Sequence, residues 1–193
     1  MVFVNNTKRI IFESAIKIFS KNGYNGATMD AIAADASVAK GTLYYHFKSK
    51  EEIFKYIVEK GMNVLIEKIE IDSKKEKNAL DKIKILCKAQ WGLVYENRDF
   101  IKVVMSQLWG QEIRQLELRE YIRSYIIYIQ NYLKQCMKEG SIKKCDSLFL
   151  AYTLFGTICS VAVYELLNED KKDLDDMIEN LMSHILDGIK KGE

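Results

Sequence analysis

The chain of 193 residues contains no proline, and only 10 of its residues are glycine. An all-β fold needs many tight turns, and these two residue types build most of them. Hydrophobic residues make up 48% of the sequence, which excludes global disorder. In segment after segment they recur every three or four positions. We therefore expect an all-α protein of one or two domains.

The spacing predicts about nine helices. Their ends fall at glycine, asparagine or charged turns, for example at Asn22-Gly23 and at Gly140. We expect Ser49 to cap the fourth helix. The expected helices cover about 7–22, 29–36, 39–47, 49–71, 80–97, 100–108, 111–139, 146–168 and 174–189.

Residues 28–47 have the pattern of a helix, a tight turn and a second helix. Four apolar residues in this stretch can form a small core with the first helix of the chain, namely Ile32, Val38, Leu43 and Phe47. The outward face of the second helix would present a cation, hydroxyls and aromatic rings, a mixture suited to phosphates and base edges in a major groove. A small helical hairpin with a solvated polar face is the alternative that the residues alone leave open.

The stretch Ala39-Lys40-Gly41-Thr42-Leu43-Tyr44-Tyr45-His46-Phe47-Lys48-Ser49-Lys50-Glu51-Glu52-Ile53 resembles the signature of the TetR family of transcriptional repressors. The preceding Thr28-Met29-Asp30-Ala31-Ile32-Ala33 and the amphipathic first helix are similar to that family too. The resemblance covers about residues 7–60. It implies a DNA-binding domain of three helices over residues 1–50, followed by a helical regulatory domain over residues 51–193.

The resemblance also implies a role for each matching residue. Thr28 would bring a helix N-terminus to a phosphate, and Lys40 and Gly41 would begin the recognition helix against the bases. Tyr44 would contact a base or the backbone. The remaining phosphate contacts would come from Thr42, Tyr45, His46 and Lys50. Tyr44 and Tyr45 can alternatively belong partly to the core, and His46 can be a local cap.

Two residues depart from the family pattern. Ser37 stands where glycine is usual in the turn, so a positive φ at this position would cost about 1 kcal/mol. Ala39 stands where serine is common, which removes a capping hydroxyl. Both affect how the second helix of the motif docks on DNA.

A helix-turn-helix protein reads two half-sites as a dimer, so a homodimer is expected. Residues 147–164 carry no charge. A helix that is apolar all round is buried on both sides or lies in a bilayer. Serine, threonine and glycine dilute this one, so we expect no membrane helix here. The predicted dimer interface is formed by helices at 147–167 and 174–190.

The rest of the regulatory domain is rich in large side chains, which line ligand pockets as readily as they fill cores. The candidate ligand-binding residues are Trp91, Tyr95, Phe100, Met105, Trp109, Tyr121, Tyr125, Tyr128 and Phe155. Gln90, Gln107 and Arg123 are candidate polar groups near such a pocket. The expected effector is a small apolar or amphipathic molecule that releases the repressor from its operator.

Other functions are weakly supported by the sequence. The only two histidines, His46 and His184, lie in different predicted units, and we find no phosphate-binding loop, metal-ligand spacing or serine nucleophile motif. We therefore expect no catalytic residues, cofactor or metal. The four cysteines are far apart, as free thiols in a cytoplasmic protein would be. A regulatory domain that only dimerises or binds a protein partner, without sensing a small molecule, remains the alternative.

Overall fold

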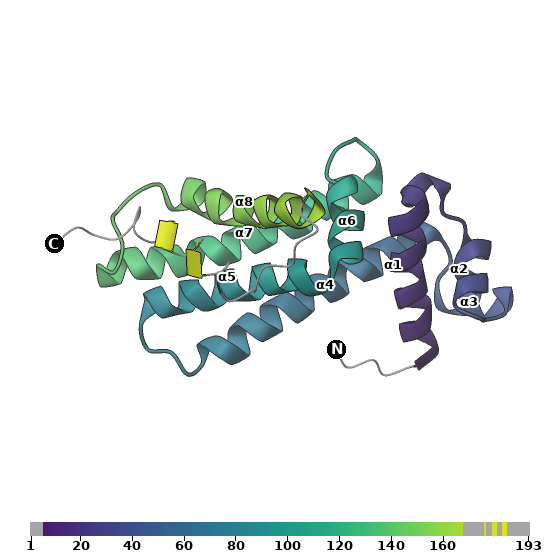
Figure 1. Cartoon of the computed structure of the whole chain (residues 1–193), viewed down its shortest axis with the longest axis horizontal. Helices are drawn as coiled ribbons and strands as arrows, with labels where there is room; N and C mark the ends of the chain where they lie inside the picture. Colours follow the sequence, from purple (N-terminus) through teal and green to yellow (C-terminus); the bar gives the residue numbers. More distant parts are fainter. Residues whose placement is uncertain (1–5, 168–175, 177–178, 181–182, 185–193) are drawn as a thin grey trace. The chain divides into compact units, whose positions relative to one another are not determined.

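The structure, a computed structural model, describes residues 6–167, 176, 179–180 and 183–184. Within this part the chain forms eight helices and no strand (Figure 1). They are α1 (Asn6–Gly26), α2 (Met29–Asp35), α3 (Lys40–His46), α4 (Lys50–Ser73), α5 (Ala79–Glu96), α6 (Arg98–Ser106), α7 (Ile113–Glu139) and α8 (Ser147–Leu167). The all-α prediction is confirmed. The helix expected at 174–189 lies largely outside the described residues.

The helices group into two compact units. The first contains the chain up to Val64 together with Arg98–Tyr121. The second contains Leu65–Asn97 and the chain from Ile122 onward. Helices α4 and α7 therefore contribute residues to both units, and the first unit is built from two separate segments of the sequence.

In the first unit, α1 packs against other helices through one apolar face. Its apolar face buries Ile11, Ala15 and Phe19 completely or almost completely. Helices α2 and α6 both contact α1. Gly61 of α4 lies directly against Phe100 of α6, because a Cβ added at Gly61 would be only 2.2 Å from the ring. The absence of a side chain at Gly61 thus permits this close packing.

In the second unit, α5 packs against α8. The buried residues recur along α5 at helical spacing, including Ile83, Cys87, Trp91 and Val94. Asn78 caps α5 by accepting a hydrogen bond from the Leu80 amide at 2.8 Å. The buried face of α5 thus forms part of the core of the second unit.

Candidate functional site

The turn between α2 and α3 has a specific backbone geometry. Ser37 has a φ of +53°, the left-handed conformation that glycine adopts more easily. Its amide donates to the Ala34 carbonyl at 3.1 Å, and the Val38 amide donates to the Ala33 carbonyl at 3.0 Å. These two bonds form a Schellman motif, with serine at the position that usually holds glycine. The strain expected at Ser37 is therefore present.

The helix-turn-helix core is also as expected. Ile32, Leu43 and Phe47 are at most 1% exposed, whereas Val38 is only half-buried. Ala39 occupies the N-cap of α3 and makes no capping hydrogen bond with its side chain. The core fixes α3 against the unit and leaves the opposite face of α3 in solvent.

Most of the residues predicted to bind DNA lie on this motif with solvent access. Thr28 caps α2 by accepting a hydrogen bond from the Ala31 amide at 3.1 Å. Tyr44 and Tyr45 are 43% and 78% exposed, so neither belongs to the core. The exposed members of the predicted set are Thr28, Lys40, Gly41, Tyr44 and Tyr45, and the half-buried ones are Thr42, His46 and Lys50.

Lys40, at the start of α3, forms an exposed ion pair with Asp30 of α2. Its Nζ lies 2.5 Å from the Asp30 carboxylate. The hydrogen bond from Lys40 to Asp30 raises the pKa of the lysine. The side chain is therefore charged and is held at the N-terminal end of the recognition helix, where base contacts are made in this class of motif.

Lys50 lies at the start of α4, and its ammonium group faces the end of α1. Lys50 Nζ donates to the backbone carbonyls of Tyr24, Asn25 and Ala27 at 3.0, 3.4 and 3.2 Å. It also lies 4.7 Å from the centre of the Tyr24 ring. Three carbonyl acceptors use all three donors of an ammonium group. The side chain therefore stabilises the loop before α2, a role that its position in the sequence did not reveal.

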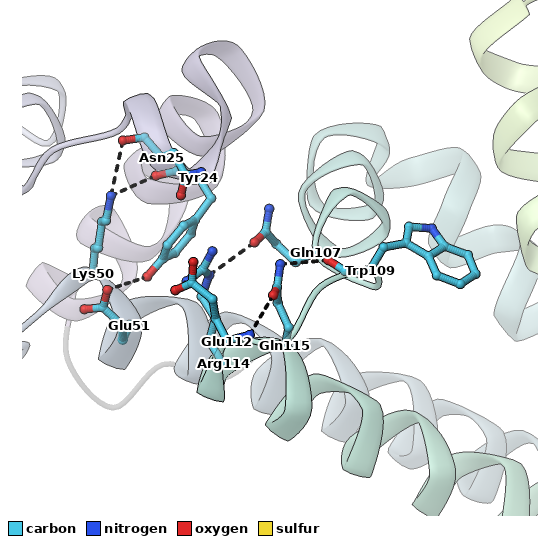
Figure 2. Close-up of polar contacts among 9 residues, drawn as sticks. All are labelled: Tyr24, Asn25, Lys50, Glu51, Gln107, Trp109, Glu112, Arg114 and Gln115. Carbon is cyan, nitrogen blue, oxygen red and sulfur yellow. Dashed lines mark hydrogen bonds and ion pairs between the residues drawn. The ribbon is translucent and has the colours of Figure 1, made fainter.

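Tyr24 connects this loop to the start of α7 (Figure 2). Its hydroxyl donates to Glu51 at 2.9 Å, and the Arg114 guanidinium lies 4.0 Å from the centre of its ring. Arg114 is only 8% exposed, and it also donates to Gln107 and Glu112. Burial and the bond to Glu51 raise the pKa of Tyr24, which keeps its hydroxyl protonated. The cluster fixes α7 to the helix-turn-helix unit through a cation–π contact.

The predicted ligand-binding residues are distributed over both compact units. Phe100, Met105, Trp109 and Tyr121 belong to the first unit, and Trp91, Tyr95, Tyr125, Tyr128 and Phe155 belong to the second. In the first unit, Trp109 is 81% exposed and Phe100 packs against Gly61. The Tyr121 hydroxyl donates to Glu59. Phe100 and Tyr121 therefore each contact a residue of α4 within the first unit.

Within the second unit, several of the predicted residues form one aromatic cluster. The Tyr125 ring stacks on that of Tyr128, with centroids 6.1 Å apart, and meets Phe155 edge-on at 6.5 Å. Trp91 is fully buried, and its indole N–H donates to the Thr157 hydroxyl at 2.9 Å. An apolar, aromatic interior with a few fixed polar groups is typical of a small-molecule site.

The polar candidates differ in position. Gln90 is completely buried in the second unit and donates to the Tyr125 hydroxyl at 2.7 Å. Gln107 is buried in the first unit against Arg114, and Arg123 is exposed. The sequence did not single out Arg114 or Tyr24. In the sequence, Arg114 lies two residues after Glu112 near the start of a helix, a pattern that is also typical of a solvated helix start.

Helix α8 has a large exposed apolar surface. Residues 147–164 have a mean hydropathy of 1.7, enough in length and composition to cross a membrane, yet only 17% of this window is buried. The large exposed side chains on this helix are Leu148, Phe149, Tyr152, Val163 and Leu167. Exposed apolar patches of this kind mark interaction surfaces.

Comparison with known proteins agrees with the helix-turn-helix geometry. Residues 11–57 match the family model of bacterial regulatory proteins of the tetR family, and residues 58–188 match that of the C-terminal region of YsiA-like proteins. The Bacillus subtilis fatty acid metabolism regulator protein is 29% identical over 182 residues, which cover 93% of each chain.

Solved structures give the same result. A Clostridium perfringens protein, whose proposed role is regulation of fatty acid metabolism, is 46% identical with a TM-score of 0.88 over 95% of this chain and 100% of its own. The transcriptional regulator FadR from Bacillus subtilis, solved with stearoyl-CoA, shares the fold at 24% identity and a TM-score of 0.84, over 94% and 98% of the two chains. The chain is a member of the tetR family of bacterial transcriptional regulators, with a C-terminal region of the YsiA-like type.

Proposed function

We propose that this regulator is a homodimeric, cytoplasmic repressor that a fatty acyl compound releases from its operator DNA. Residues 1–50 act as the DNA-binding domain, and residues 51–193 bind the effector and form the dimer. The observation that carries the proposal is the solvent-facing side of α3, which presents Lys40, Tyr44 and Tyr45 beside a buried core. The relatives named for fatty acid metabolism support the class of effector.

Dimerisation follows from how such a motif reads DNA. Two recognition helices must enter successive major grooves, about 34 Å apart, so a second copy of the chain is required. The exposed apolar residues of α8, which include Phe149 and Leu167, form the surface that this copy covers. Phe149→Glu is expected to shift the protein from dimer to monomer in sedimentation velocity runs.

The regulatory step is a coupling between two binding equilibria. An effector that binds better to a conformation with the wrong spacing of recognition helices weakens DNA binding by the same factor. Helices α4 and α7 are suited to transmit the change, because each contributes residues to both compact units. A coupling of about 1–3 kcal/mol corresponds to a 5- to 150-fold loss of operator affinity.

The test begins with selection of the operator from random duplex DNA, followed by fluorescence anisotropy with stearoyl-CoA as the probe. We expect the acyl compound to release the DNA and free CoA to have no effect. Lys40→Ala should reduce the preference for the selected sequence over random DNA, with Lys134→Ala, an exposed lysine of α7, as the control. Equal losses on both DNAs would exclude Lys40 from base recognition, and DNA that stays bound at saturating acyl compound would exclude the proposed effector.

A further inference from the structure

Gln90 is a buried residue whose amide is only half satisfied. Its Nε2 donates to the Tyr125 hydroxyl at 2.7 Å, and its Oε1 has no hydrogen-bond partner within the described part of the chain. Gln90 and Tyr125 are 0% and 1% exposed. No other buried side-chain oxygen or nitrogen in the described residues lacks a partner. A buried acceptor without a donor is destabilising, and the rarity of such groups in native proteins calls for a specific cause.

The hydrogen-bonding capacity of the pair follows from the orientation of the Gln90 amide, whose Nε2 faces the Tyr125 hydroxyl. In the orientation described, the Tyr125 hydroxyl accepts from Gln90, so its own proton is available for another acceptor. In this orientation Gln90 Oε1 is a free acceptor, and the Tyr125 hydroxyl and the second Nε2 proton can still donate.

The neighbouring polar groups are already paired. The Trp91 indole donates to Thr157, the Thr157 hydroxyl donates to the Leu154 carbonyl at 2.6 Å, and the Tyr128 and Tyr132 hydroxyls lie 3.1 Å apart. Burial raises the pKa of Tyr125, so its hydroxyl stays protonated and can donate. Because these polar groups are paired with one another, the part of a bound molecule that contacts the cluster would be mainly hydrocarbon.

A hydroxyl group is the chemical partner that satisfies this pair, because it accepts one hydrogen bond and donates another. We propose that Gln90 and Tyr125 together select an acyl chain that carries a hydroxyl group, which accepts from Tyr125 Oη and donates to Gln90 Oε1. The inference rests on the proposed fatty acyl effector and specifies its chemistry. An unsubstituted chain would leave both groups unpaired and would bind more weakly for that reason.

The experiment is calorimetric titration of the full chain with stearoyl-CoA and with 3-, 10- and 12-hydroxystearoyl-CoA. We expect at least one hydroxylated compound to bind about tenfold or more tightly than stearoyl-CoA, since one satisfied buried hydrogen bond is worth about a factor of ten. Tyr125→Phe and Gln90→Met should each bring this ratio close to one while stearoyl-CoA still binds. Tyr132→Phe, which removes a hydroxyl bonded to Tyr128 instead, should keep the wild-type ratio.

The outcomes separate this inference from the proposed function. If stearoyl-CoA and all three hydroxylated compounds bind equally well, the pair holds a water molecule and the selection for a hydroxyl is refuted. A ratio that survives both Tyr125→Phe and Gln90→Met also refutes it. If none of the four compounds binds to the wild-type chain, the fatty acyl effector itself is excluded. Circular dichroism spectra of the three variants establish that each is folded.

Discussion

Replacing Ser37 with glycine should stabilise the protein, although it removes a hydroxyl and adds no contact. Ser37 has a φ of +53° in the turn between α2 and α3. In this left-handed region of backbone conformation, a residue with a Cβ is destabilised by about 1–2 kcal/mol, whereas glycine is not. Part of this gain, about 0.4–1 kcal/mol, is offset because glycine has more backbone freedom in the unfolded chain, which stabilises the unfolded state. The expected net gain in the free energy of unfolding is about 0.5–1 kcal/mol.

The assay is urea unfolding followed by far-ultraviolet circular dichroism, at one fixed protein concentration because a dimer is expected. Ser37→Ala is the matched variant, since it keeps the Cβ and its strain and loses only the hydroxyl. We expect Ser37→Ala to remain within about 0.5 kcal/mol of the wild type and Ser37→Gly to exceed both. A Ser37→Gly protein no more stable than Ser37→Ala would refute the assignment of strain to this turn.

Three further predictions concern packing, capping and thiol chemistry. Gly61→Ala should lower the free energy of unfolding by about 1–3 kcal/mol, measured by the same urea titration, because the new Cβ meets the ring of Phe100. Lys50→Met should cost about 1–3 kcal/mol in that titration, because three carbonyls at the end of α1 lose their charged donor. In a thiol-labelling time course at pH 8, exposed Cys145 should react early. Cys87 should react only after unfolding, because burial raises the pKa of its thiol to about 12.

Each of these predictions has its own control. Gly92→Ala adds the same methyl group to α5, where nothing lies within 4 Å of the new Cβ, and should be neutral or stabilising. For Lys50, an unchanged unfolding midpoint would show that the carbonyl contacts contribute nothing. Cys145→Ser should remove the earliest labelling phase, and an earliest phase of unchanged amplitude would contradict its assignment to Cys145, the exposed thiol among the four.

The sequence predicted where the helices begin and end better than it predicted which residues contact one another between helices. Helix α7 ends before Gly140, which has a φ of +74°, and α1 is interrupted at Gly23, which has a φ of +69°. Ser49 caps α4 as expected, by accepting from the Glu52 amide. These features are local, so the residue types that tolerate or form them identify them directly.

Which residues would face one another was much harder to predict. Spacing made Phe100 and Trp109 candidates for a ligand site, and it gave no sign that Phe100 packs on Gly61 or that Trp109 is exposed. Helical periodicity identifies a buried face and says nothing of the element that buries it. The pairing of Arg114 with Tyr24 joins residues 90 positions apart, and no local pattern encodes such a contact.

The split of the first unit between two stretches of sequence limits how regulators of this kind can be recombined. A chimera that exchanged only residues up to Val64 would separate Ser20 from Asp99, whose side chains are hydrogen-bonded, and Tyr24 from Arg114. Unless the recipient protein has matching residues at the positions of Asp99 and Arg114, the exchanged segment would lose these contacts. A graft intended to change operator specificity should therefore carry Arg98–Tyr121 along with the N-terminal segment, or confine itself to the exposed face of α3.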